Sequence, residues 1–230
     1  MSLSEKKLHP DYYSHDFAYQ KRRKDGYPGW DEADVMAQSI KDMDSLLGRL
    51  KLEARSKVLD LGCGAGNLSF WLEEKGFAVY GCDISETAIE WAKELAGERG
   101  SSVGFQVADA TKTLAYPSKF FDLVMDNHCL HCIIGEDREH YLKEVYRVLK
   151  PGAFYILSTM CSDSSHPIGV EGFDPVTRCI VKGDTAIRYI GLARDIIQEI
   201  TRSGLALIHQ EISLSDGAEL FVIAVKSSGS

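Results

Sequence analysis

The sequence predicts an α/β domain in which a doubly wound, mostly parallel sheet of seven strands ends in an antiparallel hairpin. Three observations support this prediction. Short apolar runs alternate with amphipathic segments between residues 58 and 158, as expected of successive βαβ units. A glycine-rich turn follows the first of these runs. Two further apolar runs after residue 204 flank a Ser-Asp-Gly turn, a pattern typical of a hairpin.

The expected strands lie at residues 58–61, 77–82, 103–107, 121–125, 154–158, 205–212 and 220–225. Helices are expected between them, and one more precedes the first strand. We expect Asp31 to cap that first helix, whose apolar face runs from Val35 to Leu50. The helix before the fifth strand is expected to end at Pro151-Gly152, because proline cannot continue a helix.

Two segments do not fit the strand–helix alternation. Residues 9–30 are rich in aromatic and charged residues without a clean period, so residues 1–30 are interpreted as a lid. Residues 161–189 are interpreted as a cap, inserted after the fifth strand and containing a β-hairpin at residues 178–189. Because no repeat or linker interrupts the chain, residues 1–230 are expected to form a single domain with these two additions.

Composition narrows the functional classes. The net charge of −8 argues against nucleic acid as the main partner. No apolar run approaches the ~20 residues of a membrane span, and the charged start of the chain argues against a secretory signal. The six cysteines lack the density of a disulfide scaffold, which favours the cytoplasm. The oligomeric state is left open.

The strongest chemical signal is the turn Asp60-Leu-Gly62-Cys-Gly64-Ala-Gly after the first strand. Glycines allow the backbone to approach a ligand closely and to adopt positive φ. Asp83 ends the second strand, where a carboxylate can accept hydrogen bonds from both hydroxyls of a ribose. Asp109 follows the third strand, where it can accept from an adenine amino group. A tight turn or a helix cap explains each residue taken alone, but together they outline an adenosine-shaped crevice.

With these motifs, residues 57–225 resemble the class I S-adenosylmethionine-dependent methyltransferase superfamily, which implies a Rossmann-like fold. The segment 120–128 resembles the fourth-strand motif of the superfamily, and Leu149-Lys-Pro-Gly resembles its segment before strand five. The resemblance implies S-adenosylmethionine as cofactor, with S-adenosylhomocysteine as its product.

The resemblance also implies residue roles. Asp60 faces the methionine ammonium, Gly62 and Gly64 line the methionine and ribose, and Asp83 holds the ribose. The remaining cofactor-binding residues implied are Ile84 on the adenine, Asp109 and the Ala110 amide at the adenine edge, and Asn127 near the methyl group.

Residues 22–31 resemble, less closely, the lead-in of thiopurine- and tellurite-type methyltransferases. This resemblance implies that Arg22 meets the cofactor carboxylate. The chain departs from that pattern, with Tyr19 in place of a tryptophan and Arg23 in place of a tyrosine, so a solvated basic run is the alternative. We expect Tyr19, Trp30 and Arg188 to contact the methyl acceptor.

The candidates for proton removal are His128 and, second, His131, which follow the fourth strand. The alternative is that both histidines only pack or form hydrogen bonds. Cys129 and Cys132 beside them could ligate zinc, but a second separated ligand pair is missing, so no metal is expected. The Asp-Asn pair that would complete a magnesium site after the fifth strand is also absent from Ser158-Thr-Met.

The predicted function is methyl transfer from S-adenosylmethionine, most simply to a small molecule. A protein side chain as acceptor, or a catalytically silent binding subunit, are the alternatives. A nicotinamide-dependent oxidoreductase is disfavoured because Asn67 occupies the last glycine position of Gly-x-Gly-x-x-Gly.

Overall fold

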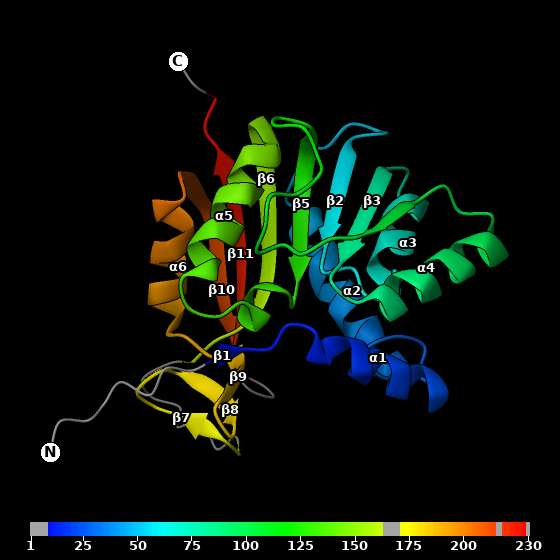
Figure 1. Ribbon diagram of the computed structural model, residues 1–230. Helices are drawn as coiled ribbons and strands as arrows, with labels where there is room; N and C mark the ends of the chain where they lie inside the picture. Colours follow the sequence, from blue (N-terminus) through cyan, green and yellow to red (C-terminus); the bar gives the residue numbers. More distant parts are fainter. Residues whose placement is uncertain (1–8, 163–170, 215–217, 229–230) are drawn as a thin grey trace, which may run out of the picture.

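The computed structural model describes residues 9–162, 171–214 and 218–228. A seven-stranded sheet forms the centre of the molecule, and helices cover both of its faces (Figure 1). A second, four-stranded sheet lies below it, beside the N-terminal segment. The predicted turn at residues 215–217 lies outside the described residues.

The large sheet contains all seven predicted strands, in the order β10-β11-β6-β5-β2-β3-β4. Neighbouring strands from β6 to β4 are parallel, whereas β11 is antiparallel to both β6 and β10. The predicted fold class is therefore confirmed. The strands are β2 (Lys57–Leu61), β3 (Ala78–Asp83), β4 (Gly104–Val107), β5 (Phe121–Asn127), β6 (Leu149–Met160), β10 (Leu205–Ser213) and β11 (Glu219–Lys226).

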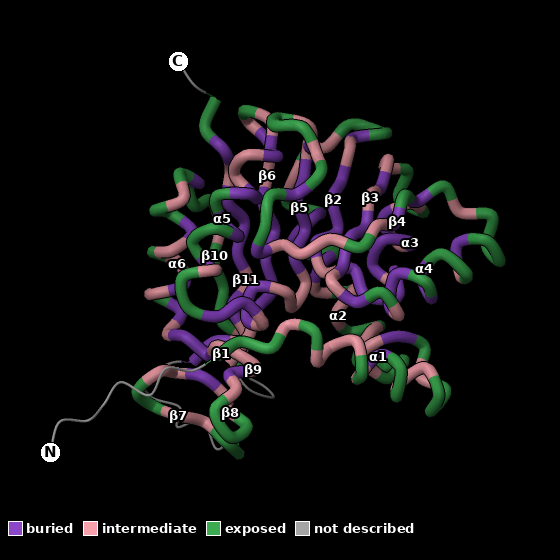
Figure 2. Tube along the Cα trace, viewed as in Figure 1, coloured by how far each residue is buried: buried purple, intermediate pink, exposed green. Residues whose placement is uncertain are grey.

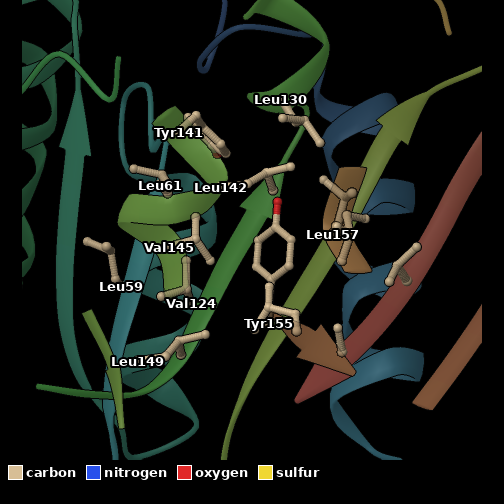
Figure 3. Close-up of a cluster of buried hydrophobic side chains, with 14 of the residues drawn as sticks. Leu59, Leu61, Val124, Leu130, Tyr141, Leu142, Val145, Leu149, Tyr155 and Leu157 are labelled. Atoms are coloured by element: carbon tan, nitrogen blue, oxygen red, sulfur yellow. The ribbon is translucent and has the colours of Figure 1, made fainter. Parts of the chain in front are cut away.

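Successive strand residues point to opposite faces of the sheet, so two cores form. On β5, Val124 faces the helices α5 (Asp137–Val148) and α6 (Ala193–Arg202). Its neighbour Met125 faces α2 (Ala33–Leu47), α3 (Asn67–Glu74) and α4 (Glu86–Arg99). Figure 3 shows the first core, where Tyr155 and Tyr141 are fully buried among leucine and valine side chains. Figure 2 shows that all central strands are buried.

Two predicted helix boundaries are wrong. Asp31 does not cap α2: the helix begins at Ala33, its N-cap is Glu32, and that side chain makes no capping hydrogen bond. Asp31 and Val35, which is 52% exposed, border a cavity instead of the core. The helix α5 ends at Val148, before Pro151-Gly152, which lie inside β6 at an irregularity of its pairing with β5. Proline is tolerated there because the regular ladder is interrupted.

The small sheet has the order β1-β9-β8-β7. Its strands β8 (Cys179–Lys182) and β9 (Thr185–Tyr189) pair antiparallel and confirm the predicted hairpin. The other two strands are β7 (Phe173–Asp174) and β1 (His9–Pro10). Pairing of β1 with β9 joins the N-terminal segment to the inserted hairpin. The interpretation of these parts as lid and cap stays a prediction.

The helix α1 (Ser14–Lys24) is fixed to the start of α4 by one carboxylate. Asp16 accepts hydrogen bonds from Ser85 Oγ at 2.7 Å, the Thr87 amide at 2.9 Å and Thr87 Oγ1 at 3.1 Å. These bonds outweigh desolvation and lower the pKa of Asp16. An anion at a helix N-terminus is favoured by the helix dipole, so this contact holds α1 across the sheet edge. None of the helices in the described part of the chain is long and apolar enough to cross a membrane.

Candidate active site

A cavity of about 1400 Å³ opens at the carboxyl ends of the parallel strands, where α1, the start of α2 and the small sheet surround it. Thirteen of the fourteen predicted site residues line it: Tyr19, Trp30, Asp60, Gly62, Gly64, Asp83, Ile84, Asp109, Ala110, Asn127, His128, His131 and Arg188. The exception is Arg22. The strand ends therefore bring together residues from six separate segments, as the parallel topology requires.

The glycine turn joins β2 to α3 and leaves its backbone open to the cavity. Gly62 and Gly64 have φ values of +80° and +54°, which side-chain-bearing residues rarely adopt. A Cβ atom at Gly62 would lie 2.7 Å from the Cβ of Cys129, and one at Gly64 would collide with the Tyr19 hydroxyl. Glycine is thus required for both conformation and close approach.

The two acids beside this turn are buried and held in place. Asp83 accepts hydrogen bonds from the amides of Gly64 and Ser85, one on each carboxylate oxygen and both at 2.9 Å. Each oxygen keeps a lone pair that can accept from a ligand hydroxyl. Asp60 accepts from Ser69 Oγ at 2.5 Å. Burial raises the pKa of both carboxyls, that of Asp60 to about 7.

The turn after β4 is organised by Asp109, whose Oδ1 accepts from the Thr111 amide at 2.8 Å and from its hydroxyl at 2.6 Å. Asp109 therefore does stabilise a turn, which is the alternative to ligand binding that the sequence left open for this residue. The same residue also lines the cavity together with Ala110, so the two interpretations are compatible.

The loop after β5 is built on Asp126, which is fully buried. Its Oδ1 accepts from the amides of Cys129 and Leu130 at 2.8 and 3.3 Å, and its Oδ2 accepts from the hydroxyls of Tyr141 and Tyr155 at 2.6 and 3.0 Å. These four bonds fix the backbone that carries both candidate histidines.

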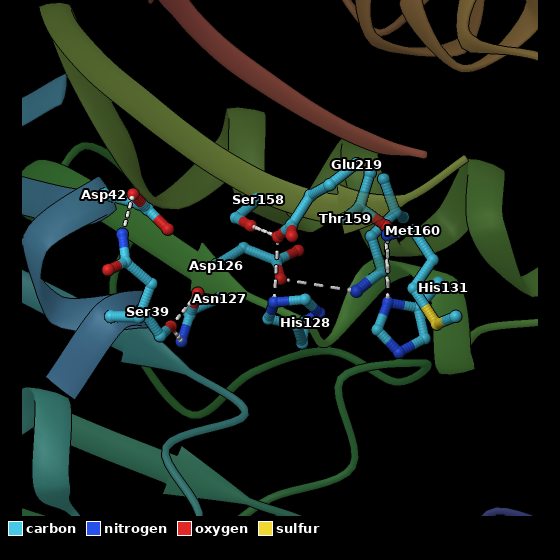
Figure 4. A network of polar contacts seen from close by, with 12 residues as sticks. Ser39, Asp42, Asp126, Asn127, His128, His131, Ser158, Thr159, Met160 and Glu219 are labelled. Carbon is cyan, nitrogen blue, oxygen red and sulfur yellow. Dashed lines mark hydrogen bonds and ion pairs between the residues drawn. The ribbon is translucent and has the colours of Figure 1, made fainter. Parts of the chain in front are cut away.

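The two histidines have different surroundings (Figure 4). His128 Nε2 lies 2.9 Å from Glu219 Oε1, and the Ser158 hydroxyl donates to that same oxygen. Burial opposes protonation of His128, but Glu219 outweighs it and raises the pKa of the imidazole. Burial lowers the pKa of His131 well below its usual value, and the nearby charges of His128 and Arg188 add to this. His131 is therefore neutral near pH 7.

Side chains of the N-terminal segment meet at Trp30. The Tyr19 ring packs edge-on against it at 5.0 Å, and the Arg22 guanidinium lies 4.5 Å from its ring centre. The Arg22 Nε is buried without a hydrogen-bond partner in the described structure. Arg188 approaches the same ring at 5.9 Å. The structure thus brings Tyr19 to the glycine turn at Gly64, and leaves Arg22 behind Trp30 rather than in the cavity wall.

Asn127 is oriented by α2, because its amide donates to Ser39 Oγ at 2.8 Å. In the described part of the chain, no three His, Cys, Asp or Glu side chains converge as a set of metal ligands.

Comparison with known proteins agrees with this geometry. Residues 59–157, from β2 to β6, match a family model described as a methyltransferase domain. Over these residues the chain is similar to S-adenosylmethionine-dependent methyltransferases, in agreement with the resemblance seen in the sequence. Its methyltransferase domain contains the glycine turn, Asp83, Asp109 and both histidines, whereas Glu219 lies outside the matched residues.

Two curated relatives and one solved structure show the extent of the similarity. The chain is 35% identical, over 56% of its length, to the 2-heptyl-1-hydroxyquinolin-4(1H)-one methyltransferase of Mycobacteroides abscessus. It is 32% identical, over 69% of its length, to the 27-O-demethylrifamycin SV methyltransferase of Amycolatopsis mediterranei. The chain spans 58% of each relative. A crystal structure of a Pyrococcus horikoshii protein superposes with a TM-score of 0.70 at 27% identity, covering 86% of this chain and 93% of that one.

Sequence reasoning missed two polar residues of the cavity wall, Glu219 and Ser158, and it missed Asp16, which fixes α1 to the start of α4. Glu219 is the first residue of an apolar strand, and Ser158 lies near the end of another, so neither belongs to a recognisable motif. The one signal in the sequence that could have pointed to Glu219 is that a charged residue begins an otherwise apolar strand.

Proposed function

We propose that this protein transfers the methyl group of S-adenosylmethionine to a small-molecule acceptor. The observation that carries the proposal is that a glycine turn, three strand-end acids and a histidine line one cavity. Its volume of about 1400 Å³ exceeds the ~300–1,000 Å³ of an ordinary ligand pocket, so it has room for a cofactor and an acceptor together. The names of both relatives specify small-molecule substrates, which supports the same class here.

The residues present fit the cofactor. The cradle at Gly62 and Gly64 admits no Cβ, and the lone pairs left on Asp83 suit a pair of hydroxyls. Asp60 would balance an ammonium group, while Ile84, Asp109 and Ala110 would hold an adenine. When bound, the cofactor supplies the methyl group as an electrophile on a sulfonium.

The protein's part in the reaction is alignment, exclusion of water and proton removal. Tyr19 and Trp30 pack against each other, with the Tyr19 hydroxyl beside Gly64, where they would shield the cofactor from water. Arg188 and His131 would face the acceptor from the small sheet and the loop after β5, and His128 would accept its proton. We include a cytoplasmic location in the proposal, because the thiols of Cys63, Cys82, Cys129 and Cys132 suit a reducing compartment.

The first test replaces the ribose-binding acid. Asp83→Ala removes the acceptor of two hydroxyls in a buried site, and the expected loss is about 1–3 kcal/mol, or roughly 5- to 150-fold in Kd. Isothermal calorimetry with S-adenosylhomocysteine measures it. Asp44→Ala is the matched control, because that carboxylate pairs with Lys75 on the surface. Equal affinity in Asp83→Ala and wild type would contradict the ribose assignment, and heat released by NAD alone would favour an oxidoreductase.

A second prediction concerns pH. Burial holds the pKa of Asp60 at about 7 in the free protein, and a bound ammonium group would favour the ionised form. Binding therefore releases a proton below pH 7, so affinity rises with pH. We expect Kd to fall about tenfold between pH 5.5 and 6.5 and to level off above about 7.5. Calorimetry of S-adenosylmethionine in buffers of different ionisation enthalpy checks this. Asp60→Asn should bind weakly without this slope, and a flat wild-type profile would exclude the role.

A further inference from the structure

We propose that Glu219 is a positioning residue that orients His128 to take a proton from a hydroxyl acceptor. This inference rests on the proposed function and names the substrate class of the same site. Glu219 begins β11, the antiparallel strand beside β6, and its carboxylate enters the cavity from the side opposite the glycine turn. It lies 2.9 Å from His128 Nε2 (Figure 4).

The first step is the tautomer of His128. Two contributions, from His128 and from the Ser158 hydroxyl, outweigh desolvation and lower the pKa of Glu219, so its carboxylate is ionised. An ionised carboxylate can only accept, so the proton of this hydrogen bond belongs to Nε2 of His128. In the neutral imidazole, Nδ1 then carries the lone pair and is the basic atom.

The second step is the strained backbone conformation in which His128 is held. Its φ is +71°, a strained conformation that residues with a side chain rarely adopt. Hydrogen bonds on both sides of His128 hold this conformation. The His128 amide donates to Ser158 O at 2.9 Å, and Asp126 accepts from the amides of the next two residues, Cys129 and Leu130. Strain maintained in this way at the wall of a cavity is the pattern expected of a functional side chain.

His131 has the same tautomer as His128, but its protein contact is made by the other ring nitrogen. The Met160 amide donates to its Nδ1 at 3.5 Å, so the neutral ring carries its proton on Nε2. His131 is therefore a hydrogen-bond donor, and its ring centre lies 5.4 Å from that of His128. One histidine can accept a proton while its neighbour donates a hydrogen bond to the same acceptor molecule.

These roles favour a hydroxyl over an amine. A neutral amine attacks with its lone pair and can lose its proton afterwards, whereas a hydroxyl oxygen becomes a good nucleophile as its proton leaves. In the proposed step, the acceptor oxygen gives its proton to Nδ1 of His128 and forms a bond to the methyl carbon. The carbon–sulfur bond breaks, and its electron pair stays on sulfur. The imidazolium then returns the proton to solvent.

The titratable groups facing His128 come from four segments: Glu219 on β11, Asp126 on β5, Asp31 before α2, and His131 in the loop after β5. Glu219 is the one that contacts the ring nitrogen. Glu219→Gln keeps an oxygen that can accept from Nε2 but removes the charge, and Glu219→Ala removes both. Glu211→Gln is the matched control, because that carboxylate borders the same cavity but lies beside His209.

The test is ¹⁵N NMR of the imidazole rings in the full chain saturated with S-adenosylhomocysteine. We expect the Nε2–H tautomer for His128 in wild type, and a pKa lower by about 1 unit in Glu219→Gln. Glu211→Gln should titrate like wild type. An Nδ1–H tautomer, or the same His128 titration in wild type and Glu219→Gln, would overturn the proposal. Failure of S-adenosylhomocysteine to bind at all would instead contradict the proposed function.

A second measurement tests the substrate class. Labelled-methyl transfer is measured with 2-heptyl-1-hydroxyquinolin-4(1H)-one, the same ring without its hydroxyl, and a panel of phenols and amines. We expect transfer to hydroxyls, with kcat about 10- to 100-fold lower in Glu219→Gln and the acid limb of its pH profile moved to lower pH. Transfer confined to amines overturns the substrate class. No transfer to any member contradicts the proposed function, and the NMR result then decides the Glu219 pairing.

Discussion

His128→Ala is expected to lower kcat by about 10²–10⁴-fold, the usual contribution of a general base. The side chain stands at the wall of the cavity, paired with Glu219, and removing it leaves the acceptor proton without a base. Affinity for S-adenosylhomocysteine should change little, because the proposed ribose contact, Asp83, ends β3 and the proposed adenine contact, Asp109, follows β4. Single-turnover kinetics with labelled cofactor measures the rate of methyl transfer, and calorimetry measures the affinity for S-adenosylhomocysteine.

The matched control is His140→Ala, since His140 is an exposed histidine on α5 outside the cavity wall. It should retain wild-type kcat. If His128→Ala turned over normally while losing stability, His128 would be a packing residue, and catalysis would depend on alignment alone.

Asp126→Ala is expected to have the largest effect on stability, about 3–5 kcal/mol of the free energy of unfolding. It leaves the buried hydroxyls of Tyr141 and Tyr155 and the amides of Cys129 and Leu130 without their acceptor, and each unpaired buried group costs about 1–3 kcal/mol. Loss of the buried carboxylate, whose pKa burial raises, offsets part of this sum. Urea denaturation followed by circular dichroism measures the change.

Asp126→Asn separates the hydrogen bonds from the charge. The amide keeps an oxygen for the two backbone groups, and the tyrosine hydroxyls can rotate to accept from its nitrogen. We expect this variant to lose less than about 1.5 kcal/mol. Equal losses in the two variants would show that the cost arises from packing, not from unpaired donors.

The sequence alone was enough to predict the sheet and to place the proposed cofactor residues at its strand ends. Each motif there is local: a strand ends, a turn follows, and the functional residue stands at that end, as Asp60, Asp83 and Asp109 do. Parallel topology places all such ends at one edge of the sheet, so the order of elements along the chain is enough to bring these residues together. The two misplaced helix boundaries, at Asp31 and Pro151, are local errors that leave this arrangement unchanged.

The contacts of Glu219 and Asp16 were decided only by the tertiary structure. Glu219 reaches His128 because β11 runs antiparallel beside β6, and Asp16 reaches the start of α4 because α1 crosses the sheet edge. Joining β1 to β9 likewise depends on a chain reversal that no short pattern encodes. The physical reason is the range of the contacts. Periodicity and turn chemistry act over a few residues, whereas these pairings are stabilised only after distant segments have packed, so sequence position alone does not reveal them.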